Sequence, residues 1–191
     1  MTMMKTITYT IRFFSQWHCG SGTSAGADVD ELVVKDKNGM PYIPGKTLKG
    51  LIREAVEDYV AFSSRGDELG CLMAETFGKE LGSVPEQTAG CAHFGNAIMD
   101  GAEYKAIVGN CAQRYMYDKI ITTAIDDDGI ARDHSLRSME VVLPCTLYAS
   151  IRDVPEEMAD VVAKSLGMIK RMGQKRNRGL GRCEIKEGGM V

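Results

Sequence analysis

Three carboxylates fall within four positions of one loop. Asp28, Asp30 and Glu31 follow a run of small residues and glycines at 18–26, which begins with His18. Carboxylates this close together could hold a divalent cation or accept a proton. Acidic loops also serve only to keep a surface solvated, and composition alone favours that simpler interpretation. The residue types therefore nominate a candidate site but do not decide its chemistry.

A second candidate lies close to the end of the sequence. The segment 170–182 contains six basic residues and no acidic residue. Its glycines, at positions 173, 179 and 181, would let the backbone come close to a ligand. The alternative is a solvated basic turn whose glycines serve only its geometry. Such a segment in a chain of net charge −3 favours phosphate binding, and the expected donors are Lys175, Arg176, Arg178 and Arg182.

The segment 42–50 contains Gly-Lys-Thr, which invites comparison with a nucleotide-binding P-loop. Five residues separate Gly39 from Gly45 where that motif has four. Pro41 and Pro44 also lack the N–H groups that a phosphate cradle needs. A P-loop is therefore excluded. The helix that follows still carries three cations on one flank, and these could follow a polyanion backbone unless the helix is simply amphipathic: Lys46, Lys49 and Arg53.

The six cysteines are spread along the chain, and no C-x-x-C pair occurs. This usage predicts free thiols in a reducing cytoplasm rather than a disulfide scaffold. Four Cys and His side chains, at positions 71, 91, 93 and 111, are candidate zinc ligands. Their spacing does not match a zinc motif, so we do not expect a zinc site.

Length and composition limit the class of protein. The chain has 191 residues, of which 26% are charged and 44% hydrophobic, so it can bury a core as one domain spanning 1–191. The acidic balance alone argues against a nucleic-acid binder, which is usually basic. No apolar run approaches the ~18 residues of a membrane span, and the N-terminal residues lack a secretory signal. We expect a cytoplasmic protein with no membrane partner.

Periodicity predicts the elements that must position these residues. Alternation predicts strands, and the 3.6-residue period predicts helices. Strands are expected at 5–14, 31–35 and 180–186, helices at 46–60 and 155–171, and a long hairpin from 116–125 and 138–151. The interval 61–112 is expected to be an irregular, lid-like insertion with short helical pieces. Without the hairpin, this order is close to β-α-β-β-α-β, an α+β ferredoxin-like fold.

Four segments in this order resemble the RAMP superfamily of CRISPR systems. The most specific is Met40-Pro-Tyr-Ile-Pro-Gly-Lys-Thr-Leu-Lys-Gly-Leu-Ile-Arg53, which is close to a family motif. The others are the segment 30–36, the hairpin segments around 121–125 and 131–144, and the basic loop 173–182. Within the superfamily, the sequence is most similar to the repeated backbone subunit of type III effector complexes, of the Csm and Cmr types.

The resemblance implies a fold and a function. The fold would be a modified RNA-recognition-motif core with a β-hairpin thumb at about 114–150. Copies of the subunit would line a CRISPR guide RNA together with other type III subunits, and each thumb would interrupt the guide–target duplex. An aspartate would then cut the target RNA with Mg²⁺ or Mn²⁺ and leave a 2′,3′-cyclic phosphate. The matching position is Asp30, with Asp28 beside it.

The same resemblance assigns RNA contacts and leaves two alternatives open. The expected contacts are His18, the three cations of the 46–60 helix and the four of the basic loop. They would hold phosphates without reading bases, since the guide supplies sequence specificity by pairing. One alternative is a guide-RNA scaffold without catalytic activity. The other is a CRISPR-RNA processing endonuclease of the same superfamily, with His18 as its general base.

Overall fold

The computed structural model describes residues 3–26, 29–63, 66–78 and 89–189. Strand β1 (Met4–Phe13) lies at the centre of its main sheet. Ile7, Tyr9, Ile11 and Phe13 are buried, whereas the residues between them are half-buried or exposed. The alternation in the sequence is therefore confirmed, and β1 gives one face to the core and leaves the other open.

The main sheet has four antiparallel strands in the order β2-β5-β1-β6. Strand β5 spans Thr146–Pro155, β6 spans Cys183–Glu187, and β2 contains only His93–Phe94. Both neighbours of β1 come from the last third of the chain. The sheet is therefore held together by pairings between residues far apart in the sequence.

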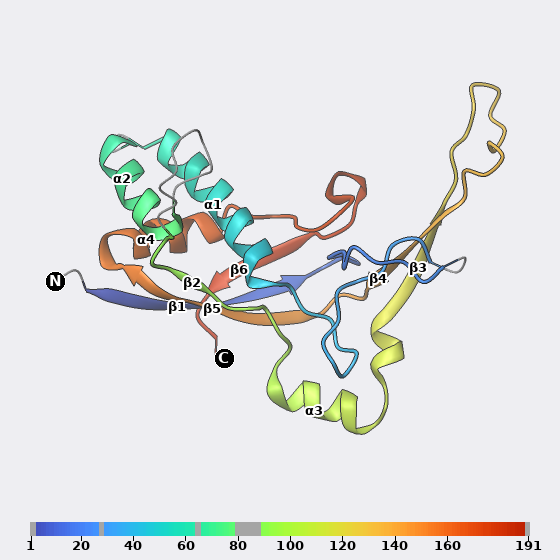
Figure 1. Cartoon of the computed structure of the whole chain (residues 1–191), viewed down its shortest axis with the longest axis horizontal. Helices are drawn as coiled ribbons and strands as arrows, with labels where there is room; N and C mark the ends of the chain where they lie inside the picture. The colour runs from blue at the N-terminus through green and yellow to red at the C-terminus, as the bar shows by residue number, and fades with distance from the viewer. Residues whose placement is uncertain (1–2, 27–28, 64–65, 79–88, 190–191) are drawn as a thin grey trace.

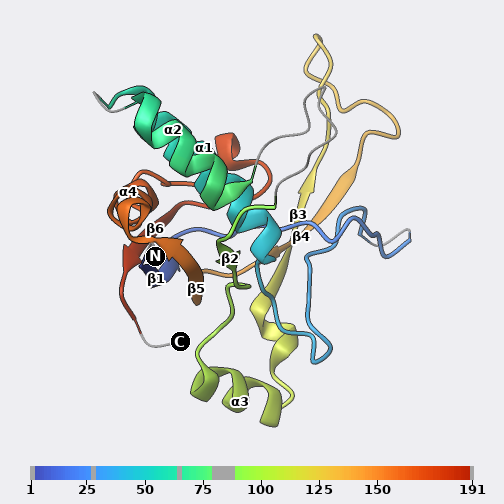
Figure 2. The same ribbon diagram turned by 60° about the vertical axis from the view of Figure 1, so that its left-hand side comes forward.

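Three helices cover one face of this sheet (Figures 1 and 2). They are α1 (Gly45–Ala61), α2 (Gly66–Phe77) and α4 (Glu156–Leu166). The helix predicted at 46–60 is confirmed, whereas the one predicted at 155–171 ends at Leu166, because Gly167 closes it. Helix α3 (Gly101–Gly109) lies apart from them and is capped by the Asp100 carboxylate. None of the helices among the described residues is long and apolar enough to cross a membrane.

A separate hairpin projects away from the main sheet (Figures 1 and 2). It pairs β3 (Tyr117–Thr122) with β4 (Arg137–Val142), and a 3-10 turn at Gln113–Met116 leads into it. The strand predicted at 138–151 is wrong as one element. It breaks after Val142 near Pro144, which has no N–H for a ladder, and its second half joins the main sheet as part of β5.

The strand predicted at 31–35 is also wrong. This segment makes only isolated bridges, from Glu31 to Met139, from Val33 to Gly20 and from Lys35 to Pro41. The remaining strand of the main sheet is instead β2, which lies inside the interval predicted to be irregular, together with α2 and α3. Two residues are too few to show a period of two, so β2 has no signal in the sequence.

Candidate nucleic-acid interface

Asp30 lies beside the hairpin, against the start of β4. Its backbone N–H donates to the Ser138 carbonyl at 3.0 Å. Its Oδ2 accepts from the Ser138 N–H at 2.7 Å, and no hydrogen bond within the described residues engages Oδ1. The carboxylate is thus fixed through one oxygen and presents the other. Asp28, the second predicted catalytic residue, lies outside the described residues.

Glu140 on β4 holds the rest of the Asp30 segment. Its Oε2 accepts from the Val33 N–H at 3.1 Å, and its Oε1 pairs with the Lys35 ammonium at 2.7 Å. Its own N–H donates to the Glu31 carbonyl at 3.0 Å. The Lys35 ammonium also lies over the Tyr117 ring, 4.0 Å from its centroid. Residues 30–35 are therefore attached to the hairpin although they form no strand.

His18 lies beneath this segment and is completely buried, with 0% of its surface exposed. Its Nδ1 lies 2.6 Å from the Glu140 carbonyl oxygen, which can only accept, so Nδ1 carries a proton. Its Nε2 lies 4.0 Å from Glu31 Oε2, with Gly20 packed close by. The expected RNA contact is therefore not available in this structure, because the imidazole is enclosed and ties two backbone segments together.

A polar pocket of about 350 Å³ opens beside Asp30. Its wall comes from three parts of the chain: the 18–24 loop, the segment 30–32 and Gln174 at the start of the basic loop. The Gln174 N–H donates to the His18 carbonyl at 3.0 Å, and this bond holds the start of the basic loop against the 18–24 loop. The structure thus brings the candidate carboxylate and the basic loop to one place, although 144 positions separate Asp30 from Gln174.

The three cations of α1 differ in availability. Lys46 is exposed and Lys49 is half-buried, and neither makes an ion pair within the described residues. Arg53 instead pairs through Nε with Glu57 Oε1 at 2.9 Å and donates to the Gly78 carbonyl at 3.3 Å. The guanidinium of Arg53 is therefore largely occupied in holding α1 to the segment after α2.

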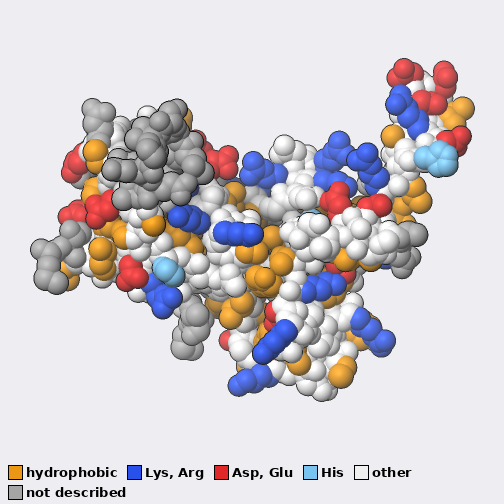
Figure 3. All heavy atoms as spheres, viewed as in Figure 1, with side chains coloured by type: hydrophobic (Ala, Val, Ile, Leu, Met, Phe, Trp, Pro, Cys, Tyr) orange, Lys and Arg blue, Asp and Glu red, His pale blue; other side chains and the backbone are white. Residues whose placement is uncertain are grey.

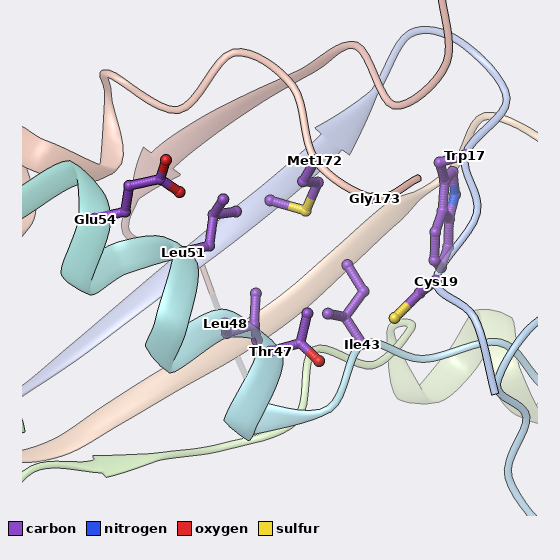
Figure 4. A pocket seen from close by; sticks show the side chains of 9 residues that line it. All are labelled: Trp17, Cys19, Ile43, Thr47, Leu48, Leu51, Glu54, Met172 and Gly173. Atoms are coloured by element: carbon purple, nitrogen blue, oxygen red, sulfur yellow. The ribbon is translucent and has the colours of Figure 1, made fainter. Parts of the chain in front are cut away.

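A mainly apolar pocket of about 170 Å³ joins α1 to the start of the basic loop. Figure 4 shows Leu48 and Leu51 of α1 on one side and Met172 on the other, with Trp17 and Cys19 closing one end. The helix with Lys46 and Lys49 and the loop with the second basic cluster therefore flank one hollow. Lys and Arg side chains gather on the surface between the helices and the projecting hairpin (Figure 3).

Two glycines of the basic loop serve the fold. Both have positive φ, and a Cβ would meet the His18 carbonyl oxygen at 2.4 Å from Gly173 and the Met172 carbonyl oxygen at 1.8 Å from Gly181. The sequence-based interpretation, that these glycines admit a ligand, is therefore wrong for both, because the chain itself fills that space. Only Gly179 faces open space, with φ of 92°.

The cations of the basic loop point to two different surfaces. Arg176 and Arg178 are exposed on the short 3-10 helix η2 (Arg176–Arg178), and Lys175 beside them is half-buried in a left-handed conformation. Arg182 lies beyond the loop, where its guanidinium is over the Phe14 ring, 5.7 Å from the centroid. Lys175, Arg176 and Arg178 thus form one cluster, and Arg182 lies apart from it.

The thiols differ in exposure. Cys71 and Cys111 are exposed, whereas burial raises the pKa of Cys145 and of Cys183 to about 11. In the part of the chain that the structure describes, no group of three or more His, Cys, Asp or Glu side chains is placed to hold a metal. The four side chains considered as zinc ligands, Cys71, Cys91, His93 and Cys111, therefore do not form such a group.

Comparison with known proteins identifies the family. A sequence profile of the RAMP superfamily matches residues 10–184. The chain belongs to the RAMP superfamily. A search of curated proteins found no match. This RAMP chain has the fold of a chain in a cryo-EM structure of the type III-B Cmr-beta complex bound to cognate target RNA, with a TM-score of 0.73 at 13% identity over 96% of this chain and 97% of the other.

The apo Cmr-beta structure gives a similar result. Its matching chain has a TM-score of 0.71 at 13% identity, over 95% of this chain and 96% of the other. These likenesses extend over nearly the whole chain and include its antiparallel sheets. The predicted mixed α and β class is therefore confirmed.

Sequence reasoning missed the two residues that hold the segment containing Asp30. Ser138 and Glu140 lie on β4, 108 and 107 positions after their partners Asp30 and Val33. Glu140 occurs in a segment that resembles the family, but nothing in its spacing indicates which loop it would contact. Alternation along 138–142 was the only signal, since it places Ser138, Glu140 and Val142 on one side of the strand.

Proposed function

We propose that this RAMP chain is a backbone subunit of a type III CRISPR effector complex. The subunit binds guide RNA and cleaves complementary target RNA, with Asp30 as the catalytic residue. Family membership and the fold likeness to chains of Cmr-beta complexes support this proposal. The observation that carries it is the Asp30 carboxylate, held through Oδ2 at the mouth of a polar pocket with Oδ1 left for a ligand.

The fold supports the finer parts of the proposal. The strand order β2-β5-β1-β6, with α1 and α4 on one face, is the order expected of a ferredoxin-like core. In this proposal the β3–β4 hairpin is the thumb, and it splays one target nucleotide from the duplex beside Asp30. Lys46, Lys49, Lys175, Arg176 and Arg178 bind guide phosphates, whereas Arg53 and His18 stabilise the fold. The partners are guide RNA, target RNA, copies of this chain and other type III subunits.

One carboxylate oxygen at this site, Asp30 Oδ1, is available to a divalent cation. Mg²⁺ is commonly bound through one or two carboxylates, with substrate phosphates and water as its other ligands, and Asp30 Oδ1 would be the ligand from this chain. A bound Mg²⁺ or Mn²⁺ would offset charge on the reacting phosphate. The carboxylate assists removal of the 2′-hydroxyl proton, the 2′ oxygen bonds to phosphorus as the bond to the 5′ oxygen breaks, and that oxygen takes up a proton. The products are a 2′,3′-cyclic phosphate and a 5′-hydroxyl.

The contact with Ser138 also favours a second candidate, the inactive guide scaffold. The Asp30 carboxylate accepts a backbone N–H at 2.7 Å and so fastens its loop to β4. This structural role is sufficient to explain the contact without catalysis. The processing endonuclease has no such support, because the Nε2 of His18 is enclosed and cannot reach an RNA hydroxyl as a general base would.

The test uses the complex assembled with guide RNA, labelled complementary RNA and Mg²⁺ or Mn²⁺. Wild type should cut at regular intervals, and Asp30→Asn should lower the rate by roughly 100-fold or more while the guide remains bound. Glu187→Ala, an exposed carboxylate on β6, is the matched control and should cut normally. Cutting by Asp30→Asn at the wild-type rate would remove Asp30 from the mechanism. No cutting by wild type, with guide bound, would establish the scaffold.

A further inference from the structure

An exposed aromatic ring lies close to two arginines at the end of β1. Phe14 has 45% of its surface exposed. The guanidinium of Arg12 lies 5.3 Å from its ring centroid, and that of Arg182 lies 5.7 Å away. Both distances are within the range of cation–π attraction. Because Ile11 and Phe13 face the core, Arg12 and Phe14 lie on the face of the sheet opposite the helices.

Neither arginine makes an ion pair with a residue that the structure describes. Neither Arg12 nor Arg182 has a carboxylate within 4.0 Å among the residues that the structure describes. The carboxylate opposite Arg12 across the strands belongs to Glu184, and it pairs with Lys186 at 3.0 Å instead. Two cations close to an apolar ring, neither of them paired with a described carboxylate, are suited to an anionic ligand that also has a flat face.

Backbone contacts hold this group in place where β1 ends and β6 begins. The Phe14 N–H donates to the Arg182 carbonyl at 2.8 Å. The Arg182 N–H donates to Ser15 Oγ at 2.9 Å, and Phe13 pairs with Cys183 in the adjoining strands. The ring and the two guanidinium groups therefore start from fixed backbone positions, which lowers the entropy lost on binding.

We propose that Arg12, Phe14 and Arg182 form a stacking platform for one base of a single-stranded RNA. The base lies against the exposed part of the Phe14 ring, and the guanidinium groups contact the phosphates on either side. Aromatic and arginine side chains bind single strands in this way without reading sequence. The inference rests on the proposed function for its ligand class. It adds a contact on the sheet face opposite Lys46 and Lys49.

The test measures binding of fluorescent rA and rU oligonucleotides to the full chain by anisotropy. Phe14→Ala should weaken binding roughly 5- to 100-fold, as expected for loss of one stacked base. Phe14→Leu, which keeps apolar bulk without a π face, should weaken it similarly, and Phe14→Trp should retain it. The matched control is Phe62→Ala, since Phe62 is 91% exposed beyond the end of α1 and should not contribute.

Salt dependence separates stacking from charge. Phe14→Ala should leave the slope of log K against log salt unchanged, whereas Arg12→Met should reduce it by ~0.7 for one phosphate lost. A Lys46→Ala/Lys49→Ala variant tests the proposed function separately. If that variant loses binding while Phe14→Ala and Phe14→Leu bind like wild type, the platform is wrong and the proposed function stands. Wild type that binds neither oligonucleotide would overturn both.

Discussion

Replacing Glu140 by Ala should release the segment that carries Asp30 from β4 without changing Asp30 itself. Glu140 accepts the Val33 N–H and pairs with Lys35, and its side chain is only 14% exposed. Val33 is buried, so its N–H would lose its partner where water cannot replace it. The segment would then depend on isolated bridges, on backbone hydrogen bonds such as that from the Val34 N–H to the Cys19 carbonyl, and on the hydrogen bonds between Asp30 and Ser138.

The magnitude follows from these contacts. A buried N–H left without a partner costs about 1–3 kcal/mol, and a half-exposed ion pair contributes about 0.2–1 kcal/mol. We therefore expect Glu140→Ala to lower the free energy of unfolding by about 1–4 kcal/mol. Glu140→Gln should cost less than about 1 kcal/mol, because its amide oxygen can still accept from Val33 and only the ion pair is lost.

Urea unfolding followed by circular dichroism measures this difference, with Glu187→Ala as the control for an exposed carboxylate. In the assembled complex, Glu140→Ala should slow target cutting more than Glu140→Gln while guide binding is unchanged. Equal unfolding free energies for Glu140→Ala and Glu187→Ala would refute the reasoning, because the Val33 N–H would then have found another partner at no cost.

Three further outcomes follow from local geometry. Gly181→Ala should destabilise the protein far more than Gly179→Ala in urea unfolding, since the first places a Cβ at 1.8 Å from a carbonyl oxygen and the second costs only the ~1–2 kcal/mol of a left-handed residue. Unfolding free energy should fall by about 1 kcal/mol per buried thiol between pH 8 and 9.5, because the thiols of Cys145 and Cys183 ionise in the unfolded chain but stay protonated in the fold, with pKa about 11. A Cys145→Ala/Cys183→Ala variant should lose the share of that decline that these two thiols contribute, and an unchanged slope would exclude them as its cause. Asp100→Ala should cost about 1 kcal/mol, because its carboxylate caps two N–H groups of α3, and no change in unfolding would show that α3 is stable without the cap.

The sequence predicts the elements with a clear period well. Strand β1 and helix α1 follow from the alternation of Ile7, Tyr9 and Ile11 and from the apolar stripe through Leu48 and Ile52. The sequence does not predict very short strands or segments that make only isolated bridges. Strand β2 pairs its two residues with β5, and only the folded sheet creates that pairing.

For the candidate site, the sequence identifies residue types but not their neighbours. Asp30 and the basic loop are visible as local compositions. The contacts of Asp30 with Ser138 and of His18 with Glu140 join segments more than 100 positions apart, so no local pattern reports them. The same limit explains Arg53, whose basic charge is evident in the sequence although its ion pair with Glu57 at 2.9 Å is evident only in the fold.

The central position of β1 has a consequence for synthesis of the chain. This strand is made before both of its neighbours, since β5 and β6 begin at Thr146 and Cys183. At ~5–20 residues per second, roughly ten to thirty seconds pass before the second edge of β1 can be covered. Until β5 and then β6 are made, this alternating apolar strand has open edges, which is the exposure that favours aggregation. Production of this protein should therefore depend on chaperones that shield β1 until β6 is made.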